Sequence, residues 1–106
     1  MVFIKSNWLD AVTTPQVTET VELVGLFRFG VEVVTTGEPV VALRVQGTID
    51  GTSWRDLMQL SGPGIYYSAG DTPYPIKGLR LNLLELDGGT GAISLTASLI
   101  AAEAQR

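Results

Sequence analysis

The chain has 106 residues, which is enough for one domain with one hydrophobic core. It contains no cysteine and no histidine, which excludes disulfides, thiolate chemistry and the commonest general base and transition-metal ligand. The net charge is −4 and the seven Lys and Arg residues are scattered, so neither nucleic acid nor an anionic membrane is an expected partner.

Residues 1–18 are expected to form an extended N-terminal arm. Phe3, Ile4 and Trp8 are apolar but follow no regular period, and the segment 13–16 (Thr-Thr-Pro-Gln) breaks the chain after them. An apolar segment ahead of the first patterned strand often docks on a neighbouring subunit, so these three residues are candidate partner contacts. The alternative is that the segment forms the first edge strand of its own sheet.

Residues 19–106 are expected to form the β-domain. Apolar residues occupy alternate positions from Val21 to Val33 and again from Val41 to Ile49, which predicts strands with one buried face. Gly25 and Gly30 lie within the first run and indicate a bulge or a close backbone approach.

The pair Asp50-Gly51 follows Ile49 directly and is a strong hairpin signal, because both residue types tolerate positive φ angles. Residues 53–60 are the expected returning strand, and Trp54 is expected to pack on the end of the core. Asp50, Gly51 and Trp54 are therefore assigned a structural role in this hairpin.

Short apolar segments and turns follow to the C-terminus. Ile65-Tyr66-Tyr67 is a short aromatic strand, and the segment 70–75 is a loop that contains Tyr74. The segment 79–83 alternates, after which Leu84-Glu85-Leu86 is expected to shift phase. A glycine-rich turn at 87–91 then leads to a last alternating strand.

These strands recur about every eight to twelve residues with no amphipathic helix between them, which indicates an all-β fold. The predicted architecture is a single antiparallel β-sandwich or jelly-roll-like domain with an N-terminal arm.

Catalysis is not expected. The eleven carboxylates fall mostly at turns and on wet strand faces, whereas a glycosidase needs two that face each other across a cleft. The segment 88–91 (Gly-Gly-Thr-Gly) lacks the lysine and the helix of a phosphate loop, and no loop has the dense Asp and Asn pattern of a calcium site. The sequence therefore predicts no enzyme, no cofactor and no metal site.

The segment Val45–Leu57 is the most distinctive part of the sequence. Together with Gly64–Tyr67, the Leu-Arg-Leu-Asn segment 79–82 and the hairpin at 88–99, it resembles a class of small tailed-bacteriophage virion proteins over roughly residues 20–100. The hairpin alone also resembles that of discoidin-type (F5/8 type C) galactose-binding sandwiches.

The phage resemblance implies a decoration, or cement, protein on the outside of an icosahedral capsid. Its partners would be the major capsid protein and further copies of itself in a homotrimer, and its location the virion surface after assembly in the host cytoplasm. The composition agrees, because 45% apolar and only 17% charged residues in so small a domain predict that another chain covers part of the surface. Tail and head-fibre proteins share this fold class.

The rival interpretation is a carbohydrate-binding or fibre adhesion module that uses exposed aromatic rings as sugar platforms. Trp54, Tyr66, Tyr67 and Tyr74 are the residues that could serve in this way. The three tyrosines are also candidate partner contacts under the capsid interpretation.

Overall fold

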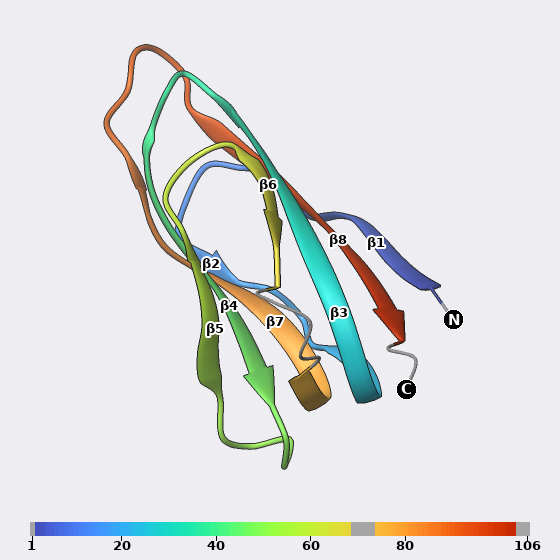
Figure 1. Ribbon diagram of the computed structural model, residues 1–106. Helices are drawn as coiled ribbons and strands as arrows, with labels where there is room; N and C mark the ends of the chain where they lie inside the picture. The colour runs from blue at the N-terminus through green and yellow to red at the C-terminus, as the bar shows by residue number, and fades with distance from the viewer. Residues whose placement is uncertain (1, 69–73, 104–106) are drawn as a thin grey trace.

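The computed structural model describes residues 2–68 and 74–103, apart from the side chains of residues 24–27, 74, 75 and 103. Within these ranges the regular secondary structure consists of β-strands alone, and all strand pairings are antiparallel. The strands form two layers around one hydrophobic core (Figure 1). The predicted all-β sandwich is therefore confirmed.

The first sheet has β1 (Val2–Val12) at one edge, followed by β8 (Ser94–Glu103), the C-terminal part of β3 (Val21–Thr36) and β6 (Gly64–Tyr67). Segments from both ends and the middle of the chain are thus neighbours in one layer. The alternation within β3 and β8 directs one face of this sheet into the core and leaves the other face outside.

The second sheet has β2 (Gln16–Val17) at one edge, followed by the C-terminal part of β7 (Tyr74–Asp87), β4 (Val40–Thr48) and β5 (Arg55–Leu60). The N-terminal parts of β3 and β7 pair with each other and join the two sheets along one side. The two longest strands therefore belong to both layers, which holds the sandwich together.

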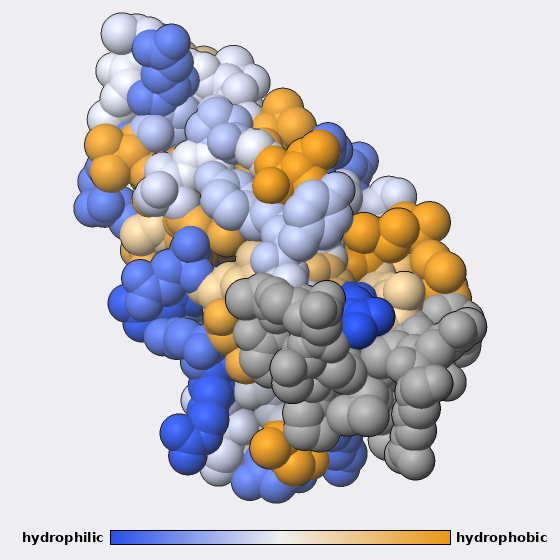
Figure 2. Space-filling model, in the orientation of Figure 1, coloured by the Kyte–Doolittle hydropathy of each residue, from blue (hydrophilic) through white to orange (hydrophobic). Residues whose placement is uncertain are grey.

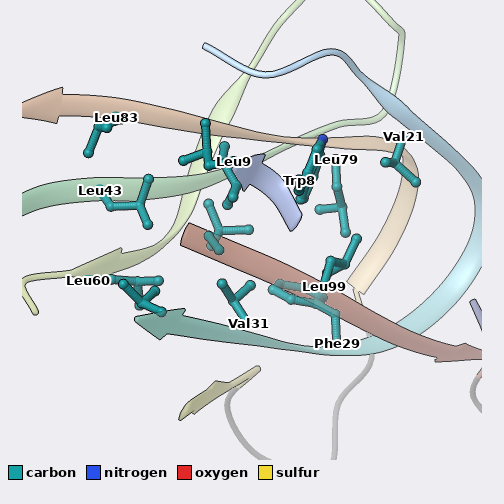
Figure 3. Packing of buried hydrophobic residues seen from close by; sticks show 14 of the residues in the cluster. Trp8, Leu9, Val21, Phe29, Val31, Leu43, Leu60, Leu79, Leu83 and Leu99 are labelled. Atoms are coloured by element: carbon teal, nitrogen blue, oxygen red, sulfur yellow. The ribbon is translucent and has the colours of Figure 1, made fainter. Parts of the chain in front are cut away.

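The core consists of the inward positions of both sheets, and the alternation of β3, β4, β7 and β8 correctly predicts most of them (Figure 3). Gly25 lies at a register shift in the pairing of β3 with β7, as a bulge there predicts. The predicted change of phase after Leu83 is also found, because Leu43 pairs with Leu83 while Ala42 pairs with Glu85. Leu84 is consequently exposed and Leu86 is buried.

The prediction of a separate arm over residues 1–18 is wrong. Residues 2–12 form the edge strand β1, which pairs along β8. Trp8 and Leu9 lie among the buried core residues, with 7% and 2% of their surfaces exposed. Figure 3 shows both side chains within the core, close to Leu79. The sandwich therefore includes the N-terminal segment, as the alternative interpretation held.

Two bulges explain why β1 shows no period in the sequence. Asn7 and Ala11 have φ angles of 50° and 48°, and each lies within a register shift of the β1–β8 pairing. The N–H of Asn7 donates to Oγ of Ser98 at 2.9 Å, and the N–H of Ala11 donates to Oγ1 of Thr96 at 3.0 Å. Each bulge resets which side chains face inward, so the alternation disappears although the segment is a strand.

The connection between β4 and β5 is longer than a two-residue turn and spans residues 49–54. Oδ1 of Asp50 accepts hydrogen bonds from the N–H groups of Thr52 and Ser53 at 2.8 and 2.7 Å, and Gly51 has a φ of 88°. Ile49 was expected on the buried face but is 73% exposed, because β4 ends at Thr48 and the loop leaves the sheet there.

We expect the Asp50 carboxyl in this loop to stay ionised at an unusually low pH. The N–H groups of Ser53 and Thr52 hold the pKa of the Asp50 carboxyl well below its ordinary value of 3.8. A lowered pKa in the folded state means that the stabilisation is complete above 3.8 and is lost only as the pH falls through the lowered value. The backbone amide NMR signals of Thr52 and Ser53 should therefore keep their positions as the pH is lowered through 3.8.

The control for this titration is Asp50→Asn, in which these amide signals should be shifted at neutral pH and should no longer respond to titration at this site. Amide signals in the unchanged protein that titrate with a midpoint at 3.8 or above would contradict the capping role of Asp50.

Candidate interaction surface

The outer face of the first sheet carries a row of positions that crosses four strands. Ile4 of β1 pairs with Ile100 of β8, Ile100 pairs with Gly30 of β3, and Gly30 pairs with Tyr67 of β6. Ile4, Ile100 and Tyr67 are 63%, 46% and 70% exposed. This cross-strand row therefore presents large apolar side chains to the outside.

Two further exposed residues extend the row on either side, and we call the whole set the apolar face. Its members are Val2, Ile4, Ile65, Tyr67 and Ile100. Figure 2 shows hydrophobic residues gathered over β1 and β8 on this side of the molecule. Exposed apolar residues are ordinary when they are single, but a contiguous group of this kind is a candidate interaction surface.

The centre of the apolar face is not flat but carries a raised ring with a hollow on either side. The ring of Tyr67 lies over Gly30, where a Cβ atom would come within 2.9 Å of Cδ1 of Tyr67, so glycine leaves the room that the ring occupies. Two shallow hollows of about 250 Å³ each border this ring. Glu32 and Ile65 help to line one hollow, and Arg28 helps to line the other.

Of the predicted partner contacts, the structure brings Ile4 and Tyr67 together on the apolar face. The prediction for Trp8 is wrong, because its ring is buried and its Nε1 donates to the carbonyl oxygen of Glu19 at 3.2 Å. Phe3 is half-buried and packs against the core, so it does not belong to the apolar face. Both side chains point inward because β1, although an edge strand, packs one face on the core.

The remaining two tyrosines do not join the apolar face. Tyr66 is half-buried against the core, and its hydroxyl donates to the carbonyl oxygen of Gly62 at 2.9 Å. The expected loop at 70–75 is wrong for its last two residues, because β7 begins at Tyr74, whose backbone pairs with Phe27. Residues 70–73 and the side chain of Tyr74 lie outside the described residues.

Sequence reasoning missed Val2, Ile65 and Ile100. The signal for Ile100 was present: Ala97, Leu99 and Ala101 hold the inward positions of β8, so Ile100 is an apolar residue on the expected wet face. No such signal existed for Val2, because the bulges of β1 hide its phase.

A second feature lies on the outer face of the second sheet, where polar side chains form a network. Cζ of Arg80 lies 4.2 Å from the centroid of the Trp54 ring, and Nε of Arg80 donates to Oε1 of Gln46 at 2.9 Å. Nε2 of Gln46 donates to Oδ1 of Asp56 at 2.7 Å, and Asp56 pairs with Arg44 at 2.8 Å. The network thus joins the hairpin motif to the Leu-Arg-Leu-Asn strand.

The expectation that Trp54 packs on the end of the core is wrong. Its ring is half-buried on the guanidinium of Arg80, outside the core cluster, because the loop at 49–54 ends on the outer face of the sheet. One face of the ring is therefore occupied by the chain itself.

We expect Trp54→Ala to lower the free energy of unfolding by about 1–2 kcal/mol, the range of a partly desolvated cation–π contact. This is less than the about 3–5 kcal/mol that loss of a buried aromatic ring costs. Urea unfolding followed by circular dichroism measures the difference. Trp54→Phe keeps a ring over Arg80 and is the control, which should retain most of the stability.

Other kinds of site find little support in the described part of the chain. Within residues 2–68 and 74–103 no three carboxylates are gathered as ligands for a metal ion. A hollow of about 420 Å³ at the loop end of the sandwich has an apolar floor of Leu57 and Ile76, with Asp50 and Arg55 at its rim. This rim does not supply two facing carboxylates.

No helix in the described ranges is long and apolar enough to cross a membrane.

No protein-family model matches the sequence, and no curated protein matches it significantly. Among solved structures, the chain is similar to the SPBc2 prophage-derived protein YomS, with a TM-score of 0.65, 10% identity and 96% of each chain covered.

It is also similar to a chain in the structure of infectious bursal disease virus, Gx strain, with a TM-score of 0.56 and 10% identity. That match covers 95% of this chain and 31% of the viral one. A third similar structure is chitosan-binding module 1 from a chitosanase/glucanase of Paenibacillus sp. IK-5, with a TM-score of 0.51, 15% identity, and 91% and 74% of the two chains covered. At these identities the likeness shows a shared sandwich fold.

Proposed function

We propose that the protein is a structural component of a phage virion that decorates the outside of an icosahedral capsid and has no enzymatic activity. Its partners are the major capsid protein and further copies of itself. The observation that carries the assembly role in this proposal is the apolar face, since a small domain that exposes Ile4, Ile100 and Tyr67 on one face gains stability when another protein covers them.

Two further observations support a virion role. The sequence motifs that resemble small phage virion proteins take part in the Trp54–Arg80–Gln46 network, which gives them a structural purpose. The fold is also that of a prophage-derived protein and of a chain in a virus structure. The fold alone does not select the capsid, and the capsid location rests on the sequence resemblance.

The carbohydrate-binding alternative has weaker support from the aromatic residues. A sugar platform needs an open ring face, but Tyr66 packs against the core, and Trp54 has one face on Arg80, which leaves at most its other face for a sugar. Tyr67 is open, and Glu32, Ser98 and Arg28 help to line the hollows beside its ring, but it is a single ring with no second described aromatic platform beside it. Similarity to a chitosan-binding module supports the fold of such a module and not its ligand site.

Co-sedimentation with phage heads that lack this protein tests the proposal. The purified protein should pellet with the heads at micromolar concentration and should saturate at a fixed number of copies per capsid. The same protein should not bind chitosan or an array of glycans. Absence of head binding, or specific glycan binding instead, would overturn the capsid proposal.

A further inference from the structure

We infer that a second copy of this chain covers the apolar face, in a two-fold pair whose axis runs along the row from Ile4 through Ile100 and Gly30 to Tyr67. This inference rests on the proposed function, because it names which partner of the virion protein takes this surface. Three properties of the face support the choice: its size, its charges and the shape of the edge beside it.

The size of the face suits a small homodimer. β3 pairs with β8 from Phe27 to Thr36, and β1 and β6 extend the layer to either side. At about 3.3 Å per residue and about 4.8 Å per strand, this face measures about 30 Å by 14–19 Å, or about 400–600 Å². Two such faces together would bury about 800–1,200 Å², the range of small, weak interfaces, and a second copy of the same face matches the whole surface in size.

The charged residues of the face are complementary to those of a second copy in the opposite orientation. Arg28 and Glu32 lie on β3 two residues before and two residues after Gly30, and both are exposed on the outer side. A two-fold axis that lies across β3 at Gly30 reverses the strand direction of the second copy, which places its Glu32 opposite Arg28 of the first. Among the described charged side chains of β3 on this face, each then lies opposite one of the other sign.

The same axis brings apolar groups into contact. Ile4 and Ile100 lie on the axis, so each faces its own equivalent in the second copy, and the exposed Tyr67 ring stands beside a hollow of about 250 Å³ that a partner side chain could fill. An isologous contact of this kind is closed and adds no further copies.

The edge beside the face is unsuited to the main alternative, which is pairing of two edge strands. β1 carries bulges at Asn7 and Ala11, and such bulges twist an edge strand away from a straight partner. Self-association through the β1 edge is therefore disfavoured relative to contact through the face.

Matched substitutions on the two sheets test the inference. Ile100→Glu puts a carboxylate on the proposed axis, while Leu84→Glu makes the same change at an equally exposed position of the second sheet, with 46% and 45% of the side chains exposed. Analytical ultracentrifugation of the isolated protein at micromolar concentration should give the mass of a dimer for the unchanged chain and for Leu84→Glu. Ile100→Glu should give a monomer with an unchanged circular dichroism spectrum.

A cysteine variant keeps the test decisive if Ile100→Glu fails to fold. The chain has no cysteine, so Ile4→Cys introduces a single thiol next to the axis. Mild oxidation should convert it to a disulfide-linked dimer, and Leu84→Cys should stay monomeric on a non-reducing gel. An unchanged chain that is monomeric or trimeric, or an Ile4→Cys protein that does not cross-link, would overturn the two-fold pair.

The measurements separate this inference from the proposed function, because the masses are determined without phage heads. A protein that decorates heads but is monomeric in solution contradicts the two-fold pair and leaves the capsid role standing. A dimer that is lost in Ile100→Glu but does not bind heads supports the pair and contradicts the capsid role.

Discussion

Replacing Trp8 by alanine is expected to lower the free energy of unfolding by about 3–5 kcal/mol, the range for removal of a buried aromatic ring from a packed core. The ring is 7% exposed and packs in the same cluster as Leu9 and Leu79, and its Nε1 donates to the carbonyl oxygen of Glu19. Loss of the ring leaves a cavity and removes this hydrogen bond. Urea unfolding followed by far-ultraviolet circular dichroism measures the change.

Ile4→Ala on the same strand is the control. Its side chain is 63% exposed, so the isolated domain should lose no more than about 0.5 kcal/mol. Equal stability of Trp8→Ala and the unchanged protein would show that residues 2–12 form an arm rather than a core strand.

Gly89→Ala is expected to destabilise the fold by about 2–4 kcal/mol. Gly89 has a φ of 74°, and a Cβ atom there would collide with the carbonyl oxygen of Gly37, which accepts a hydrogen bond from the N–H of Thr90 at 2.9 Å. The connections that follow β3 and β7 meet at this point. Alanine at this position destabilises the fold in two ways. The left-handed conformation costs about 1–2 kcal/mol, and the collision with the Gly37 carbonyl oxygen disrupts the backbone contact between the two connections.

Gly91→Ala separates the two contributions. Gly91 has a φ of 70°, but a Cβ atom there meets no other atom within 4 Å, so only the conformational cost applies. Thermal unfolding should rank the unchanged protein first, Gly91→Ala second and Gly89→Ala last. Equal melting temperatures for the two variants would contradict the close packing of the two connections.

Much of the sandwich follows from local pattern. Val21 to Val33 and Leu95 to Leu99 alternate because each strand has one face in the core and one outside, and the glycine-rich turn at 87–91 has the positive φ angles that its residues favour. β1 could not be predicted in this way, because the bulges at Asn7 and Ala11 depend on hydroxyl groups some ninety residues away along the chain.

The candidate surface was harder to predict than the core. Ile4 and Tyr67 could be named as candidate contacts from the sequence, but their position on one face with Ile100 depends on the strand order β1, β8, β3, β6, which brings together segments from the whole chain. The placement of Trp54 failed for a related reason. A tryptophan after a hairpin turn can pack on either side of the sheet, and Arg80 from a distant strand decides which.

Electron cryomicroscopy of phage heads reconstituted with the purified protein tests the central claim most directly. The account predicts density for this sandwich on the outside of the capsid, with the apolar face of each copy covered by protein. Heads that remain bare at saturating protein would contradict it, as would bound copies whose Ile4, Ile100 and Tyr67 stay open to solvent.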